Sequence, residues 1–239
     1  MLTIIIPTFN EAENLQKLTD QLLKLDFQDL NILVVDDNSP DGTGDVAEEL
    51  KNKYPRRIAV LHRKYKMGLG TAYKSGFLYA LEHDADIILQ MDADFSHPVK
   101  KITEMVGAIE DCDCVIGSRY VDGGSLDERW PLWRKGLSAF GNNYAKIILK
   151  LPIKDITGGF RLWRSETLQF FPFNRIKSNG YAFQVEMAFV GHCLGCNFIE
   201  IPIYFADRKW GKSKMSLKVQ IEAALRVWYM LFQYKDLIR

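Results

Sequence analysis

The sequence predicts an α/β fold built on a Rossmann-like, mostly parallel sheet that helices cover on both faces. Up to Gly117, short apolar runs alternate with amphipathic segments. The apolar runs are continuous rather than alternating, as expected for strands that are buried on both faces. Polar and acidic residues follow each run directly, and ligands of parallel sheets bind outside the carboxyl ends of the strands. We therefore expect a binding site along that edge.

Five strands and four helices are expected in this first half. The strands correspond to the apolar runs at 2–6, 31–37, 58–62, 86–91 and 114–117. The intervening helices are indicated by apolar residues at helical spacing. These are Leu15, Leu18 and Leu22, then Val46, Ala47 and Leu50, then Ala72, Gly76 and Ala80, and finally Ile102, Met105, Val106 and Ile109.

The pattern changes after Gly117 and predicts a second, smaller subregion of the same domain. Residues 118–134 read as a loop rich in charge, Gly and Trp, and 160–163 and 198–205 read as strands on either side of a helix at 181–193. Another helix is indicated by Leu137, Phe140, Ala145 and Ile148. We expect one catalytic domain, 1–216, followed by a C-terminal amphipathic helix, 217–239.

Composition excludes several classes of protein. With 31 basic and 30 acidic residues the net charge is +1, which argues against a nucleic-acid binder. No apolar stretch reaches the ~18 residues of a membrane span, and the first residues do not resemble a secretory leader, so we expect a cytoplasmic protein. The four cysteines, including Cys193 and Cys196, are interpreted as reduced thiols rather than as a metal site.

Two carboxylates follow the fourth expected strand. Asp92 and Asp94 are two residues apart, so in an extended segment they point the same way. Buried together they would repel each other, and a divalent cation removes that penalty. Mg²⁺ or Mn²⁺, held by these carboxylates with water and a substrate phosphate, fits the pattern. The chain lacks a P-loop motif, so a nucleotide diphosphate donor is expected rather than P-loop chemistry.

Seven segments together carry a resemblance to a known family. They are IIIPTFNEAENL, VVDDNSPDGT, GLGTAY, MDADFSHP, VIGSRYVDGG, WPLWRK and DITGGFRLWR, in that order between residue 3 and about residue 216. They resemble the dolichyl-phosphate mannose synthases, which are inverting family 2 glycosyltransferases of the GT-A fold. The resemblance implies transfer of mannose from GDP-mannose to a dolichyl-type polyprenyl monophosphate.

The resemblance also implies roles for individual residues. A nucleotide-sugar pocket would be lined by Pro7, Thr8, Asn10, Glu11, Asp36, Asp37, Asp92, Ala93 and Lys214. The metal would be bound by Asp92, Asp94 and, more weakly because its hydroxyl is short, Ser96. The acceptor phosphate would be bound by Arg119, Arg134 and Ser138, and a loop at 208–216 with Arg208, Ser213 and Lys214 would close over the donor.

This assignment agrees with the chemistry of the acceptor. A phosphomonoester is already an anion at neutral pH, because its second pKa is about 6. It therefore needs no general base, and we interpret Asp94 as a metal ligand rather than a proton acceptor. The catalytic set would be Asp94, Arg119, Arg134 and Arg208. Gln184 is left open between an acceptor contact and an ordinary helix residue, and Gly158–Gly159 is expected to allow close backbone approach.

The C-terminal helix has two interpretations. Leu217, Ile221, Ala224, Trp228 and Leu231 fall on one stripe, which fits either a core-packed helix or one lying in a membrane surface. Trp130 and Trp133 could enter the same layer. We expect a peripheral protein on the cytosolic face of a membrane, bound directly or through a small membrane-anchoring partner.

Three alternatives remain at this level. The same fold could transfer glucose from UDP-glucose to the same kind of lipid. A polysaccharide or protein glycosyltransferase would need a catalytic acid near the acceptor, which is not evident. A non-catalytic sugar-nucleotide-binding subunit is disfavoured because the acidic pair and the arginines are present.

Overall fold

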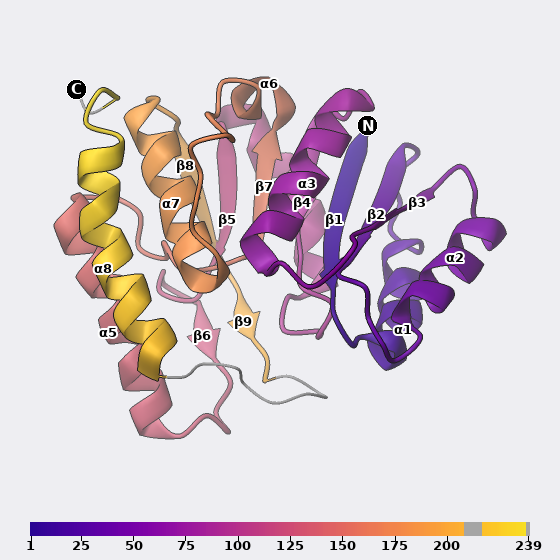
Figure 1. Ribbon diagram of the computed structural model, residues 1–239, viewed down its shortest axis with the longest axis horizontal. Coiled ribbons are helices and arrows are strands. Elements are labelled where there is room, and N and C mark those ends of the chain that lie inside the picture. The colour runs from indigo at the N-terminus through magenta and orange to yellow at the C-terminus, as the bar shows by residue number, and fades with distance from the viewer. Residues whose placement is uncertain (208–216, 238–239) are drawn as a thin grey trace.

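The computed structural model describes residues 1–207 and 217–237, and in them a seven-stranded sheet lies between two layers of helices (Figure 1). The strand order is β3-β2-β1-β4-β7-β5-β8. Its strands are β1 (Leu2–Thr8), β2 (Leu30–Asp36), β3 (Ile58–His62), β4 (Ile87–Gln90), β5 (Cys114–Ser118), β7 (Arg161–Arg164) and β8 (Phe198–Pro202). All five strands expected before Gly117 are confirmed, as is the mostly parallel, doubly covered sheet.

Each face of the sheet has its own hydrophobic cluster. On one face pack α3 (Leu69–Glu82), α5 (Leu132–Leu149), α7 (Gly180–Cys193) and α8 (Leu217–Gln233). The other face is covered by α1 (Ala12–Leu22), α2 (Thr43–Lys53) and α4 (Ile102–Ala108), the last flanked by 3₁₀ turns at Val99–Lys101 and Ile109–Asp111. A short helix, α6 (Ser165–Leu168), follows β7. Every residue of β1 is buried, which explains its unbroken apolar run.

β7 is the one strand of this sheet that runs antiparallel to its neighbours, and it lies between β4 and β5. The parallel strands place their carboxyl ends at one edge of the sheet. An antiparallel strand places its beginning there instead, so the segment before Arg161 reaches the same edge as the ends of β1, β2, β4 and β5. This topology brings Thr157 and Gly159 to the predicted binding edge.

Two local expectations were wrong. The apolar run 198–205 is not one strand, because β8 ends at Pro202 and β9 (Tyr204–Phe205) leaves the sheet. β9 pairs with β6 (Ser125–Leu126), which lies inside the segment expected to be a loop. Proline has no N–H to continue a ladder, which fits the end of β8 at that residue. The small β6–β9 sheet directs Phe205 toward the binding edge.

The helix α8 is both core-packed and surface-exposed, on different faces. Val227 and Met230 of α8, and Tyr234 directly after it, are buried in the cluster shared with α5 and α7. Trp228, on the expected stripe, is instead 50% exposed. The buried face therefore differs from the one that the sequence stripe indicated. The side chains of 217–222 lie outside the described residues.

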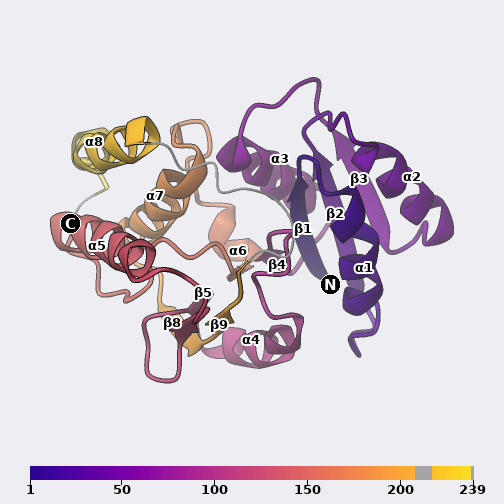
Figure 2. The same ribbon diagram turned by 90° about the horizontal axis from the view of Figure 1, so that it is seen from below.

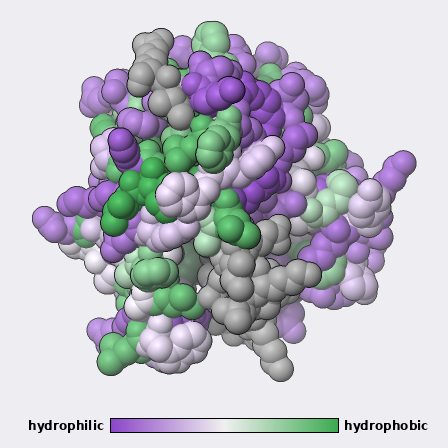
Figure 3. Space-filling model, turned by 60° about the vertical axis from the view of Figure 1, so that its left-hand side comes forward, coloured by the Kyte–Doolittle hydropathy of each residue, from purple (hydrophilic) through white to green (hydrophobic). Residues whose placement is uncertain are grey.

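The helices α5 and α8 lie next to each other at one side of the molecule (Figure 2), and exposed apolar side chains gather on that side (Figure 3). On α5 they are Leu132, Trp133, Phe140 and Ile147, and on α8 they are Leu225, Trp228, Tyr229 and Phe232. We call these eight residues the α5–α8 apolar face. Phe140, one of the residues that indicated α5 in the sequence, is 68% exposed. Within residues 1–207 and 217–237, the helices are all too short or too polar to cross a bilayer.

The contact between α3 and β1 depends on a glycine. A Cβ added at Gly76 would lie 2.5 Å from Cγ2 of Ile5, which is fully buried. We predict that Gly76→Ala lowers the free energy of unfolding by about 1–3 kcal/mol, the usual range for overpacking. Urea denaturation measures this change.

The matched control is Gly107→Ala in α4, where an added Cβ would meet nothing within 4 Å. Here alanine should leave stability unchanged or raise it by up to ~1 kcal/mol through helix propensity. Equal effects of the two substitutions would contradict the packing argument.

Candidate active site

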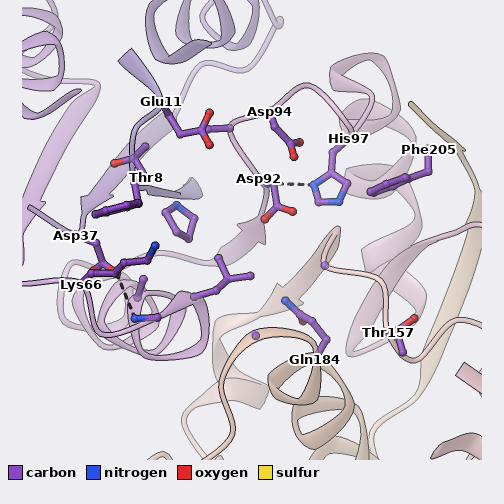
Figure 4. Close-up of a pocket in the computed structure, with 18 of the residues that line it drawn as sticks. Thr8, Glu11, Asp37, Lys66, Asp92, Asp94, His97, Thr157, Gln184 and Phe205 are labelled. Carbon is purple, nitrogen blue, oxygen red and sulfur yellow. Dashed lines mark hydrogen bonds between the residues drawn. The ribbon is translucent and has the colours of Figure 1, made fainter. Parts of the chain in front are cut away.

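A cavity of about 320 Å³ opens at the carboxyl edge of the sheet (Figure 4). Its walls come from segments far apart in the chain: the ends of β1, β2 and β4, the beginning of α3, the turn before β7, the beginning of α7, and β9. Of the residues predicted to bind nucleotide sugar, those lining it are Pro7, Thr8, Glu11, Asp37, Asp92 and Ala93. One cavity therefore lies at the edge of the sheet where the sequence predicted a binding site.

Asp92 and Asp94 both line this cavity, and each is held by hydrogen bonds. The Tyr73 hydroxyl donates to Oδ1 of Asp92 at 2.9 Å, and the backbone N–H of Ser96 donates to Oδ1 of Asp94 at 3.0 Å. Burial and the neighbouring Asp92 raise the pKa of Tyr73 well above its usual value. Tyr73 therefore stays protonated and acts as a fixed donor that orients Asp92.

The turn after Asp94 adopts an unusual backbone conformation. Phe95 has φ = 62°, in the left-handed region that non-glycine residues rarely adopt. The chain then folds back, and Nδ1 of His97 accepts a hydrogen bond from the backbone N–H of Asp92 at 3.1 Å. Because Nδ1 accepts, neutral His97 carries its proton on Nε2. Burial also lowers the pKa of His97, which favours the neutral ring.

Asp92 and Asp94 form an acidic wall of the cavity, and this wall suits a cation that takes only some of its ligands from the protein. Within the described part of the chain, no cluster of three or more His, Cys, Asp or Glu side chains forms a metal cage. Two carboxylates facing one cavity suit a divalent ion that takes its other ligands from water and phosphate. Ser96 is 1% exposed, is not part of the cavity wall, and its buried Oγ has no partner among the described residues. The geometry therefore favours Asp92 and Asp94 over Ser96 as ligands.

The opposite end of the cavity carries the groups predicted to bind the nucleotide. Asp37 pairs with buried Arg63 at 2.9 Å, and its backbone N–H donates to the carbonyl of Thr8. Burial raises the pKa of Asp37, and the attraction of Arg63 opposes that shift. Lys66 lies in the wall, with Nζ 3.7 Å from the centre of the Phe9 ring.

Two predicted nucleotide-binding residues have other positions. The Asp36 carboxylate is buried and accepts hydrogen bonds from Thr8 Oγ1 and from the backbone and hydroxyl of Ser39, at 2.6–3.1 Å. These donors occupy it, so it shapes the loop rather than the cavity surface. Asn10 is exposed with φ = 62° and lies outside the cavity wall.

On the acceptor side, Arg119 is held by Asp155. Nε and Nη2 of Arg119 each donate to this carboxylate at 2.7 Å, and Nη2 also donates to Thr157 Oγ1 at 2.7 Å. Burial alone would raise the pKa of Asp155, but the Arg119 charge and hydrogen bonds outweigh it and lower the pKa. Asp155 was not predicted from the sequence, although it stands inside the DITGGFRLWR segment.

Arg134 and Ser138 are arranged differently from each other. Arg134 stacks on the Trp130 ring at 3.6 Å and pairs with Asp207 at 3.2 Å. It lines neither the cavity at the sheet edge nor a second cavity between α5, α7 and α8. Trp130 is 9% exposed, so its expected entry into a membrane layer is wrong, whereas Trp133 is 70% exposed. Ser138 hydrogen-bonds the Tyr120 hydroxyl at 2.9 Å and lines the second cavity.

That second cavity, of about 200 Å³, is a mostly apolar groove between α5, α7 and α8. Its wall includes Leu137, Ala145, Ala182, Val185 and Val227, together with Arg119 and Thr157. Arg119 and Thr157 line both this groove and the first cavity, which we call the polar cavity because Asp37, Lys66 and Asp92 stand in its wall. The polar cavity and the apolar groove therefore meet at Arg119 and Thr157.

Sequence reasoning also missed a fully buried arginine that supports the site, Arg161. Its guanidinium donates to the backbone carbonyls of Gly158, Gln184 and Ile156 at 2.7–2.9 Å. An arginine at the start of an otherwise apolar strand was the available signal. Arg208, Ser213 and Lys214 lie outside the described residues.

The comparisons with known proteins agree with this geometry. The sequence model described as "Glycosyl transferase family 2" matches residues 3–170. The chain is 43% identical over 235 residues to an undecaprenyl-phosphate mannosyltransferase of Micrococcus luteus, covering 98% of this chain and 96% of the relative. It is 40% identical to a polyprenol monophosphomannose synthase of Mycolicibacterium smegmatis, covering 94% and 84% of the two chains.

Solved structures share the fold at low identity. A glucosyl-3-phosphoglycerate synthase from Mycobacterium tuberculosis, bound to Mn²⁺ and UDP, matches with a TM-score of 0.67, 15% identity and coverage of 98% of this chain and 79% of that one. A mannosyltransferase from Pyrobaculum calidifontis, bound to GDP-Man and Mn²⁺, matches with a TM-score of 0.58 and 17% identity, over 98% of this chain and 75% of that one. The predicted GT-A architecture is confirmed, and the chain belongs to glycosyl transferase family 2.

Proposed function

We propose that this enzyme transfers mannose from GDP-mannose to the phosphate of a polyprenyl monophosphate, with inversion at the anomeric carbon. The observation that carries the proposal is the meeting of the two cavities at Arg119 and Thr157. A nucleotide sugar fits the polar cavity, and the first isoprenoid units fit the apolar groove. An acceptor phosphate at the junction would then face the donor. The full-length relatives named for polyprenyl phosphate and mannose support this choice.

Asp92 and Asp94 are the residues that would hold Mg²⁺ or Mn²⁺. When bound, the ion neutralises the departing diphosphate. The acceptor is a dianion above its second pKa of about 6, so it attacks without a proton acceptor. Arg119 and Thr157 lie at the junction, where Arg119 would orient this phosphate, and Asp155 fixes the Arg119 guanidinium in place. The chain therefore supplies orientation and electrostatics rather than a general base.

We also propose that the α5–α8 apolar face rests on a membrane surface. Its side chains are 50–85% exposed and include three aromatic residues with polar tips, Trp133, Trp228 and Tyr229, which suit the headgroup boundary. The apolar groove opens between α5 and α8, the two helices that carry this face. A small membrane-anchoring partner could share this face. All four cysteines are free thiols, which suits the cytosolic side of the membrane.

The proposal predicts metal-dependent release of GDP from GDP-mannose only when a polyprenyl phosphate is present. EDTA should abolish turnover, and Mn²⁺ or Mg²⁺ should restore it. Asp94→Asn should weaken Mn²⁺ binding in the presence of GDP by at least tenfold and lower kcat/KM by about 10²-fold or more, because a charged ligand is lost. Calorimetry and a lipid-product assay measure the two effects.

The exposed Asp122→Asn is the matched control and should behave as wild type. If UDP-glucose with the same lipid were the faster donor, the sugar assignment would be replaced by the glucosyltransferase alternative. Failure to turn over either donor would favour a non-catalytic binding subunit. Retained metal affinity with lost activity in Asp94→Asn would overturn the ligand role.

A bulky side chain in the groove should affect the lipid alone. Gly141 lines the groove, and an added Cβ would meet nothing within 4 Å. We predict that Gly141→Phe raises KM for a long polyprenyl phosphate at least tenfold in detergent micelles, with KM for GDP-mannose unchanged. Steady-state kinetics in both substrates measure this.

Gly136→Phe is the control on the same helix, because Gly136 also has open space around it and does not line the groove. It should leave both KM values within twofold. An equal rise of KM in both variants would argue that the isoprenoid lies elsewhere.

Membrane binding should depend on the α5–α8 apolar face. Leu225→Glu combined with Phe232→Glu removes two side chains that are 67% and 72% exposed. Because burying each is worth about 1.5–3 kcal/mol, we predict at least a tenfold loss of the liposome-bound fraction in flotation. Phe170→Glu, at a residue 77% exposed just after α6, should not change it. If the wild-type protein does not float with the liposomes, direct membrane binding is contradicted and attachment through an anchoring partner is the alternative.

A further inference from the structure

Gln184 is a buried amide that faces the polar cavity from α7. It is 3% exposed and forms part of the wall, on the side opposite Asp92 (Figure 4). Its Nε2 has no hydrogen-bond acceptor among the described residues. A buried donor left in this way costs about 1–3 kcal/mol. Such an atom in a cavity wall indicates that a ligand supplies the acceptor.

The orientation of this amide follows from its neighbours. The Trp163 indole can only donate, and its Nε1 lies 2.9 Å from Oε1 of Gln90. The Gln90 oxygen therefore faces Trp163, and its Nε2 faces Oε1 of Gln184 at 3.4 Å. The opposite orientation of Gln184 would place two NH₂ groups against each other. Gln184 must therefore present Nε2, with its N–H donors, to the cavity.

Two further contacts support this position. Nη1 of Arg161 donates to the backbone carbonyl of Gln184 at 2.8 Å and fixes its backbone on α7. A Cβ at Gly159 would lie 3.3 Å from Nε2 of Gln184, closer than ordinary contact. Glycine at 159 thus leaves room for the amide in the cavity wall.

The group that fits between Gln184 and Asp92 must accept from an amide and face a carboxylate. In the proposed function the phosphates of the donor lie at the ion held by Asp92 and Asp94, so the hexose is the part of the donor left to face a neutral amide. A hexose hydroxyl accepts from the amide and can donate toward a carboxylate. We propose that Nε2 of Gln184 donates a hydrogen bond to a hydroxyl oxygen of the transferred hexose. Gln184 is then a residue that positions the donor sugar. This inference rests on the proposed function, which supplies the nucleotide-sugar donor.

The test compares binding of GDP-mannose with binding of GDP, both with Mn²⁺ and without acceptor, by calorimetry. Gln184→Met keeps the length of the side chain and removes the donor. We expect GDP-mannose to bind about 3- to 10-fold more weakly, the equivalent of one neutral hydrogen bond. Binding of GDP, which has no hexose, should stay within twofold and also reports that the variant is folded. Gln169→Met, at an exposed glutamine, is the matched control and should change neither.

The other outcomes are each decisive. Equal weakening of GDP and GDP-mannose would assign Gln184 a structural role and overturn the inference, as would no change in either. A raised KM for polyprenyl phosphate with unchanged GDP-mannose binding would place the amide on the acceptor and also overturn it. If wild type neither binds nor turns over GDP-mannose, the proposed function itself fails. Wild-type turnover with an unaffected variant refutes only the role of Gln184.

Discussion

The acceptor side of the site depends on the buried charge of Arg161. Removing a guanidinium from water costs several kcal/mol unless its donors are satisfied. Burial does lower the pKa of Arg161, but an arginine side chain stays protonated in a protein. The backbone carbonyls of Ile156, Gly158 and Gln184 satisfy it. The turn before β7 and the helix α7 are thereby tied to one cation, and neither can move away without leaving that charge exposed to an apolar interior.

The same turn balances the charge of Arg119. Asp155 accepts two side-chain hydrogen bonds from Arg119, and its own backbone N–H donates to Glu200 at 2.8 Å. Arg119 and Asp155 together are close to neutral. In the proposed reaction, this pair therefore contributes directional donors rather than net positive charge. In that proposal the repulsion between the two phosphates would be relieved mainly by an ion held at Asp92 and Asp94, and these two carboxylates would then be the dominant electrostatic element.

The fold was largely predictable because each strand and helix follows from a local pattern of apolar and polar residues in its own segment of the sequence. Continuous apolar runs located the strands, and polar residues at their ends located the cavity edge, with Thr8, Glu11, Asp37, Asp92 and Asp94 in its wall. What could not be predicted depends on contacts between distant segments. The amide orientation of Gln184 needs Trp163 and Gln90, and the pairing of Arg119 with Asp155 needs an antiparallel strand between two parallel neighbours. Spacing alone also cannot show that Asp36 is already saturated by Thr8 and Ser39.

The end of α8 and the cavity at the carboxyl edge of the sheet are connected through one buried carboxylate. Glu186 on α7 accepts hydrogen bonds from the Tyr234 hydroxyl and from the backbone N–H of Ser178, both at 2.8 Å. Beside Ser178, the Asn179 side chain accepts from the backbone N–H of Thr71 in α3, at the cavity entrance. Burial and Glu186 raise the pKa of Tyr234, so it remains a donor. Because three direct hydrogen bonds and the peptide bond between Ser178 and Asn179 make this connection, the proposed membrane contact of α8 would also fix the orientation of the cavity relative to that membrane.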